Sequence, residues 1–255
     1  MTAELWLLTA LAGFAAGLLD SIVGGGGLVL TPAMLNLHPG LNILQTIATQ
    51  RTSSLLGTSV AAWNYFRHVV VERRIVVPAL LSALAFSAIG VQFAKRIDPD
   101  TLKLAVLAVC VALAVYTVAR RDLGTREQRR FAPEREAWAA VAVGGACGFY
   151  NGLIGPGTGT LLVFAFVSVI GLDFLKSSAV SKSTNVAADL SSWTVLAIGG
   201  FVQWTLAIPL ILGNMAGSYV GSHLAIRQGD RFIRALFLVV VLALVARVAW
   251  GLLAG

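Results

Sequence analysis

Apolar segments of about 20 residues recur along almost the whole chain, and only short polar connections separate them. A segment of this length crosses a hydrocarbon core roughly 30 Å thick as an α-helix, which satisfies its own backbone hydrogen bonds. Hydrophobic residues make up 57% of the chain, and the mean hydropathy is +0.82. Because soluble domains are far less apolar, we expect an all-α polytopic membrane protein with no soluble domain. The predicted helices span 4–23, 43–66, 75–95, 101–120, 137–154, 175–198, 203–226 and 232–253.

Two further apolar segments, 25–37 and 158–170, are too short to cross the membrane comfortably. The stretches "GGGG" at 24–27 and "GPGT" at 155–158 lie where these segments begin. Glycine destabilises a helix by up to about 1 kcal/mol per residue relative to alanine. The sequence therefore predicts a helix break at each stretch, followed by a re-entrant or tilted half-helix.

The chain contains an internal repeat with a constant offset of 131 residues. Gly13 and Gly17 fall on Gly144 and Gly148, and further positions match in the same register. Glycine matches are informative because glycine is kept where backbones bend or approach closely. The connection 120–136 carries six arginines, and the positive-inside rule places it in the cytoplasm. We expect a first repeat at 1–120, an arginine-rich connection at 121–136 and a second repeat at 137–255.

The charges of the connections favour inverted repeats, each with five segments, over parallel repeats. The connection 67–74 is basic, whereas its counterpart at 198–205 is uncharged, as expected if the two lie on opposite sides of the membrane. Lys95, Arg96 and Lys103 favour the parallel alternative, because an inverted arrangement places them outside.

Charged side chains lie inside two of the predicted membrane helices. Arg51 aligns with Lys182 under the 131-residue offset, and Asp189 lies on the same helical face as Lys182. A cation inside the membrane costs at least about 2.5 kcal/mol, so both cations need partners. Either they bind an anion shared between the repeats, or Asp20 and Asp189 neutralise them as structural ion pairs. Snorkelling to the membrane interface is a third alternative.

The glycine-rich breaks offer further anion-binding groups. An opened helix exposes backbone N–H groups, and the half-helix that follows begins with the positive end of its dipole. We assign this role to Gly25, Gly26, Gly157 and Thr158. The alternative is that the glycines only permit close helix crossing, which is the interpretation we prefer for Gly13 and Gly17.

Asp20 aligns with Asn151, so the repeat keeps polarity and shape at this position but carries the carboxylate in one half only. An aspartate in a low-dielectric site can take up a proton, which makes Asp20 and Asp189 candidates for proton coupling. Equally, Asp20 can accept hydrogen bonds from the N–H groups that the glycine-rich break frees.

Several other classes of protein are disfavoured. The net charge of +7 does not indicate nucleic-acid binding, because the basic residues lie in the connections rather than on one face. Cys110 and Cys147 have no partner spacing for a disulfide or a metal site, and we expect neither a metal nor a cofactor. An intramembrane hydrolase is disfavoured because neither Asp20 nor Asp189 follows a Gly-x-Gly element and no Gly-x-Ser-Gly element occurs. We therefore expect a protein that is not an enzyme.

The sequence resembles the sulfite exporter TauE/SafE permeases, also called the toluene sulfonate uptake permease family. The resemblance covers nearly the whole chain and rests on "GFAAGLLDSIVGGGGLVLTPAML", "GFYNGLIGPGTGTLLV", "ATQRTSSLLGTSVAAWNYFRH" and "AVSKSTNVAADLSSW". It implies a multi-pass transporter of the cell inner membrane. Small anions are its implied substrates, among them sulfite, organosulfonates and other sulfur-containing organic acids.

Together these features predict a secondary transporter that works by alternating access around a central anion site. The expected partners are the small anion, the lipid bilayer, and protons or sodium as the coupling ion; a homodimer is compatible with the sequence. A passive anion channel and a carrier of a non-sulfur small carboxylate are the alternatives. The substrate-binding candidates are Arg51, Lys182, Ser53, Ser54, Thr184, Asn185, Gly25, Gly26, Gly157, Thr158 and Asn151.

Overall fold

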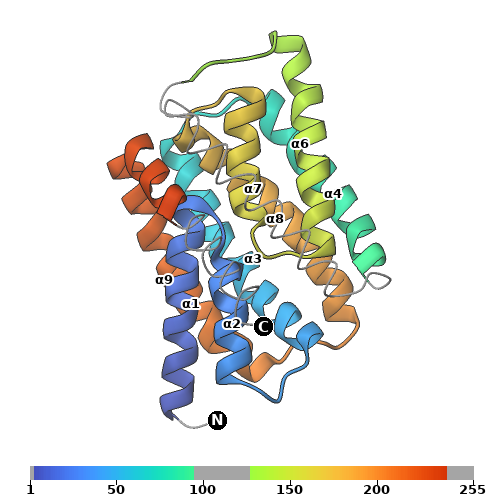
Figure 1. The fold of residues 1–255 in the computed structure, drawn as a ribbon, viewed down its shortest axis with the longest axis vertical. Helices are drawn as coiled ribbons and strands as arrows, with labels where there is room; N and C mark the ends of the chain where they lie inside the picture. Colours follow the sequence, from blue (N-terminus) through green and yellow to red (C-terminus); the bar gives the residue numbers. More distant parts are fainter. Residues whose placement is uncertain (1–2, 95–126, 240–255) are drawn as a thin grey trace, which may run out of the picture.

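The computed structural model describes residues 3–94 and 127–239. Within these ranges the chain is helical apart from short connections and contains no β-strand, which confirms the predicted all-α class (Figure 1). Residues 230–239 are helical as well. The other elements are α1 (Ala3–Val23), α2 (Gly26–Leu37), α3 (Ile43–His68), α4 (Arg73–Ala94), α6 (Pro133–Leu153), α7 (Thr158–Ala165), η1 (Phe166–Ile170), α8 (Phe174–Ile198) and α9 (Trp204–Gln228).

The six long helices coincide closely with predicted segments. The predicted helix 101–120 lies outside the described residues, as does the predicted helix 232–253 beyond residue 239. Among the described helices, α1 and α4 are long and apolar enough to cross a membrane by length and composition alone. Helices α3 and α8 miss this criterion because of the polar side chains inside them.

Both glycine-rich stretches break the helix, as the sequence predicts. Four glycines adopt a positive φ that residues with a side chain rarely tolerate, namely Gly24 (80°), Gly25 (90°), Gly155 (88°) and Gly157 (90°). The two breaks lie against each other, since a Cβ on Gly159 would be 2.9 Å from the Cα of Gly24 and a Cβ on Gly27 would be 3.3 Å from the Cα of Pro156. From this point the two half-helices extend in opposite directions (Figure 1). The predicted half-helix 158–170 consists of α7 and the π-helical segment η1.

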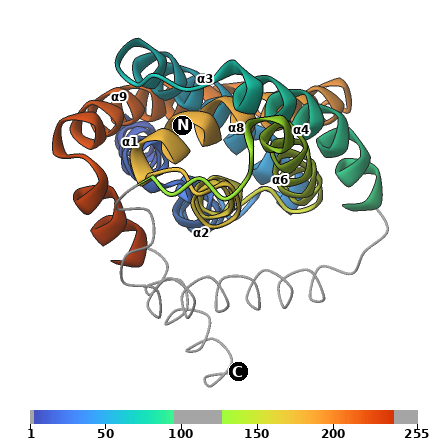
Figure 2. The same ribbon diagram turned by 90° about the horizontal axis from the view of Figure 1, so that it is seen from above.

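Helices of the first half pack mainly against helices of the second half. The most extensive contacts between described elements are those of α1 with α9 and of α6 with α4. These pairs lie on opposite flanks, with α3 and α8 between them (Figure 2). Under the 131-residue offset, α6 is the counterpart of α1 and α9 is the counterpart of α4, so the two interfaces correspond. Helix α1 runs upward and α6 runs downward (Figure 1).

Glycine lets the helices of each flank approach closely. A Cβ on Gly13 would lie 2.7 Å from the carbonyl oxygen of Leu210, and one on Gly17 would lie 2.9 Å from the Cα of Asn214. On the other flank, a Cβ on Gly148 would lie 2.5 Å from the carbonyl oxygen of Ala83. These contacts support the close-crossing interpretation of Gly13 and Gly17.

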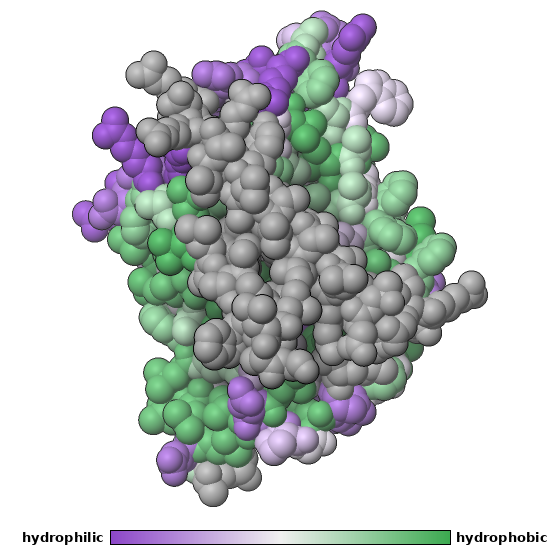
Figure 3. All heavy atoms as spheres, viewed as in Figure 1, coloured by the Kyte–Doolittle hydropathy of each residue, from purple (hydrophilic) through white to green (hydrophobic). Residues whose placement is uncertain are grey.

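Charged residues gather at the end of the molecule where α6 begins, and apolar residues cover the flanks (Figure 3). Residues 127–130 cross this end as a strap, in which the amide of Gln128 donates to the carbonyl oxygen of Gly171 at 2.8 Å. The Arg129 side chain donates to both carboxylate oxygens of Glu72 at 2.7 Å and to Glu136 at 3.0 Å, and it also pairs with Glu127.

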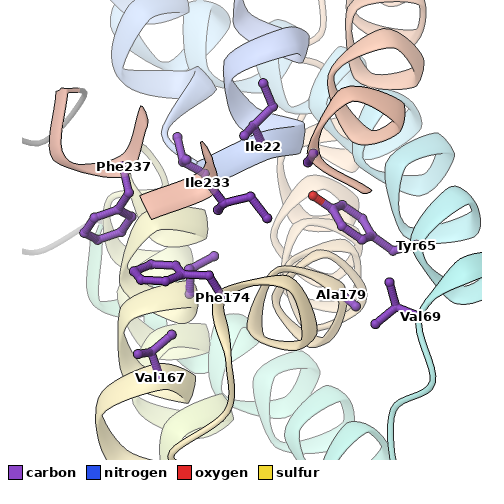
Figure 4. Close-up of a cluster of buried hydrophobic side chains, with 11 residues drawn as sticks. Ile22, Tyr65, Val69, Val167, Phe174, Ala179, Ile233 and Phe237 are labelled. Carbon is purple, nitrogen blue, oxygen red and sulfur yellow. The ribbon is translucent and has the colours of Figure 1, made fainter. Parts of the chain in front are cut away.

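An apolar cluster fills the interior near the strap (Figure 4). It joins the end of α1, the end of α3, the start of α8 and the helical residues 230–239. Its large members include Ile22, Tyr65, Phe174 and Phe237, all at most 1% exposed. This packing fills the interior at this end with apolar side chains.

Candidate functional site

A small cavity lies between the two glycine-rich breaks. Its volume is about 30 Å³, enough for one or two water-sized groups. The lining comes from the first half of α3, the loop 155–157, the start of α7, two residues of α8 and single residues of α1, α2 and α6. Of the predicted site residues, the cavity brings together Arg51, Ser54, Asn151, Gly157, Thr158, Asn185, Asp20 and Asp189.

Arg51 is the cation of this cavity. Its side chain is buried, with 6% of the residue exposed. One guanidinium nitrogen, Nη2, donates to the carbonyl oxygen of Asn151 at 2.6 Å. The other, Nη1, is buried and has no hydrogen-bond partner among the described residues. A charged donor without an acceptor is costly in a buried site, and an anion would supply the missing acceptor.

Lys182 is placed differently. It is fully buried and does not line the cavity, and its Nζ lies 3.3 Å from Oδ2 of Asp20 and also donates to the carbonyl oxygen of Asp20. This ion pair matches the structural alternative for Lys182. Snorkelling does not apply to either cation in this conformation, because neither reaches the surface.

The two cations nevertheless bind equivalent backbone groups. Arg51 of the first half binds the last turn of α6, and Lys182 of the second half binds the last turn of α1. The acceptors, Asn151 and Asp20, are counterparts under the 131-residue offset. A cation is favourable at each place because the carbonyl end of a helix carries a partial negative charge.

A second pair of matched contacts contains one carboxylate in each half, but at positions that are not counterparts of each other. Thr58 donates to Oδ2 of Asp20 at 3.2 Å, and Asn151 donates to Oδ1 of Asp189 at 2.8 Å. Thr58 and Asp189 are counterparts, as are Asp20 and Asn151. Each half therefore keeps one carboxylate in this contact, on α1 in the first half and on α8 in the second.

Asp189 is held entirely by neutral donors. Besides Asn151, Asn185 donates to its Oδ2 at 3.1 Å and Ser54 donates to the same oxygen at 3.3 Å. Asp20, in contrast, also accepts the backbone N–H of Gly26 at 3.2 Å. The last contact fits the alternative in which Asp20 accepts the N–H groups of the glycine-rich break.

The remaining predicted residues lie outside the lining. Ser53 and Thr184 donate within their own helices, to the carbonyl oxygens of Gln50 at 2.9 Å and Val180 at 2.8 Å. Gly25 and Gly26 do not line the cavity, whereas the neighbouring Gly27 does.

Several lining residues were not predicted from the sequence. Ile47, Gln50 and Pro156 line the cavity together with Gly155 and Gly159. Gln50 accepts a hydrogen bond from Thr31 of α2 at 2.7 Å, which ties α3 to the half-helix. Its position next to Arg51 could have indicated a place in the site. However, its counterpart under the 131-residue offset is Ser181, which has no amide side chain.

Fold and cavity together define a helical protein that encloses a buried polar site between broken helices, the arrangement of a membrane transporter. The sequence model of the sulfite exporter TauE/SafE family matches residues 9–248, so this chain belongs to that family. It is a membrane transporter and not an enzyme.

The chain is similar to curated relatives over nearly its whole length. It is 32% identical to the probable membrane transporter protein ORF9 of Sinorhizobium sp, covering 92% of this chain and 89% of the relative. It is 28% identical to the probable membrane transporter protein YfcA of Escherichia coli strain K12, covering 92% of this chain and 86% of the relative. No solved structure matches the chain.

Proposed function

We propose that this protein is a secondary transporter that moves a small anion, sulfite or a related organosulfonate, across the inner membrane by alternating access. The observation that carries the proposal is the free Nη1 of Arg51, buried beside a cavity and without an acceptor among the described residues. An anion bound there would satisfy a charge-assisted donor that nothing else in these ranges satisfies.

The half-helices support an anion as the occupant. The first turns of α2 and α7 both line the cavity, through Gly27 in α2 and through Thr158 and Gly159 in α7. Helix N-termini carry partial positive charge and unpaired N–H groups, which favour negatively charged ligands.

Two observations support inverted repeats, which alternating access would use. Counterpart helices α1 and α6 run in opposite directions (Figure 1), and each packs on the fourth helix of the other half. The matched polar contacts of Arg51 with Asn151 and of Lys182 with Asp20 are what a two-fold exchange would produce. In this arrangement the strap lies on the cytoplasmic side.

Of the two carboxylates, Asp189 fits proton coupling better. It lines the cavity with Arg51 and is held by neutral groups, whereas Asp20 is paired with Lys182. A proton on Asp189 would change the net charge of the site together with the anion.

A ligand panel tests the proposal on the purified protein. Sulfite, simple sulfonates, sulfate and carboxylates are added, and thermal unfolding is followed. We expect sulfite or sulfonates to raise the unfolding temperature. Equal shifts for all anions, or none for any, would contradict the proposed substrate class.

Reconstituted liposomes separate a carrier from a passive channel. A carrier coupled to protons accumulates the anion against its gradient when a pH gradient is imposed, and a sodium-coupled carrier does so with a sodium gradient. A channel only equilibrates it. Flux that never exceeds equilibrium under either gradient would favour the channel.

A further inference from the structure

Asn185 presents an acceptor that no described group satisfies. Asn185 lines the cavity and is 5% exposed. Its Nδ2 donates to Asp189, which fixes the orientation of the amide, because a carboxylate accepts and does not donate when ionised. Its Oδ1 is consequently turned away from Asp189, buried and without a donor in the described part of the chain.

Two residues that line the cavity thus carry unsatisfied groups of opposite kind. Nη1 of Arg51 needs an acceptor, and Oδ1 of Asn185 needs a donor. A fully deprotonated anion without a hydroxyl, such as acetate or ethanesulfonate, satisfies Arg51 and leaves Asn185 unpaired. A site built to hydrogen-bond a substrate hydroxyl discriminates strongly against the analogue that lacks it.

We infer that the occupant of this cavity is a small anion that also carries a hydrogen-bond donor, a hydroxyl or a protonated acid group. Its oxyanion binds Nη1 of Arg51 and its O–H donates to Oδ1 of Asn185, in a conformation wider than the present one, whose cavity of about 30 Å³ holds only one or two water-sized groups. The inference rests on the proposed function, since it names the chemistry of the anion taken up by the same site. Asn185 is the residue that sets this specificity.

The test uses pairs of ligands that differ by one hydroxyl. Dissociation constants are measured by titration calorimetry for 2-hydroxyethanesulfonate against ethanesulfonate and for glycolate against acetate, on the full chain. In the wild type we expect the hydroxylated member of a pair to bind about tenfold tighter or more. Equal affinities within both pairs would overturn the inference.

Two variants assign the preference to Asn185. Asn185→Ala removes the acceptor and should reduce the ratio of the two dissociation constants to near one. Ser183→Ala is the matched control on the same helix, because it removes a buried hydroxyl that donates to carbonyl oxygens of its own helix and does not line the cavity, so the ratio should persist. A preference that survives in Asn185→Ala would overturn the inference, whereas failure of every anion to bind the folded wild type would overturn the proposed function itself.

Discussion

Arg51 and Lys182 occupy equivalent positions in the two halves, yet their surroundings give them different roles. Lys182 has a carboxylate partner and no access to the cavity. Arg51 has a backbone acceptor for one nitrogen and none among the described residues for the other. Removing one partner of a buried ion pair leaves an uncompensated charge, whereas removing Arg51 removes a binding group. Lys182 should therefore affect stability, and Arg51 should affect transport.

Lys182→Met is expected to destabilise the protein by about 3–5 kcal/mol, because Asp20 keeps a buried charge without its partner. Thermal unfolding in detergent measures the effect. Lys182→Met with Asp20→Asn should recover much of the loss, since asparagine already occupies the counterpart position, 151. Lys176→Met is the control on the same helix, because its pair with Glu127 is partly exposed and contributes at most about 1 kcal/mol. An unfolding temperature of Lys182→Met equal to that of the wild type would refute the structural role.

The glycine-rich breaks position the helix ends and side chains that line the cavity. Gly155 ends the helical path after α6 and lies against Arg51, where a Cβ would be 2.7 Å from Nη2. The break therefore determines both the start of α7 and the position of the guanidinium. Its counterpart in the first half, Gly24, lies instead against the backbone of Gly159 and Thr160 in α7.

Gly155→Ala is expected to reduce anion binding strongly, because the new methyl group displaces the Arg51 guanidinium. The positive φ adds about 1–2 kcal/mol of backbone strain. Ligand-induced thermal stabilisation and the unfolding temperature of the free protein report the two effects separately. Gly40→Ala is the control, since a Cβ there meets nothing within 4 Å. Unchanged ligand stabilisation in Gly155→Ala would contradict the assigned contact.

Local patterns in the sequence were sufficient to predict the long helices, both breaks and the alignment of Arg51 with Lys182. The sequence offered Asp20 and Asp189 as partners of the two cations but did not assign Lys182 to Asp20, because this pair joins residues 162 positions apart and Asp189 lies on the same helix face as Lys182. The π-helical segment η1 was missed because the run 161–170, apolar apart from Ser168, carries no sign of a change in helical period. Ile47 and Pro156 are apolar residues whose place beside the cavity follows from packing alone.

One side of the molecule is closed and the other carries the cavity. The lining residues Ile47, Gln50 and Arg51 belong to the half of α3 that begins far from the strap, whereas their counterparts Ser178, Ser181 and Lys182 are fully buried. Alternating access would bury the α3 positions and expose their α8 counterparts.

Cysteine labelling tests this exchange. Gln50→Cys and Ser181→Cys are made in a background where Cys110 and Cys147 are replaced by alanine. A membrane-impermeant thiol reagent should label Gln50→Cys from one side and Ser181→Cys only from the opposite side, and substrate should change the two rates in opposite senses. Labelling of both positions from the same side would contradict alternating access between the two halves.

The strap gives the charged end a defined pH dependence. Burial raises the pKa of Glu72, but the hydrogen bond and charge of Arg129 outweigh it and lower the pKa below the ordinary value of 4.5. Burial also raises the pKa of Glu127, but the hydrogen bonds and charges of Lys176 and Arg129 outweigh it and lower that pKa. Because their pKa values are lowered in the folded state, both carboxylates stabilise the fold fully above their unfolded-state pKa. This stabilisation is lost as the pH falls through the folded-state pKa.

Hydrogen exchange of the strap is expected to show this loss. The amides of Gln128 and Arg130 donate to the carbonyl oxygens of Gly171 and Ile170, so their protection factors should fall when the pH drops below 4.5. The amide of Val69, bonded to the carbonyl oxygen of Tyr65 at 2.7 Å inside the apolar cluster, should keep its protection. Strap protection that rises on acidification would have the wrong sign for this network.

The proposed transport mechanism depends most on Arg51 as the group that binds the transported anion. Anion uptake into liposomes that contain the wild type, Arg51→Gln or Arg67→Gln tests it directly, and Arg67 is the matched control because it is exposed at the end of the same helix. We expect uptake by Arg51→Gln to fall by about tenfold or more, the effect of losing a charge-assisted hydrogen bond, while uptake by Arg67→Gln stays at the wild-type rate. Wild-type uptake by folded Arg51→Gln would contradict the central claim.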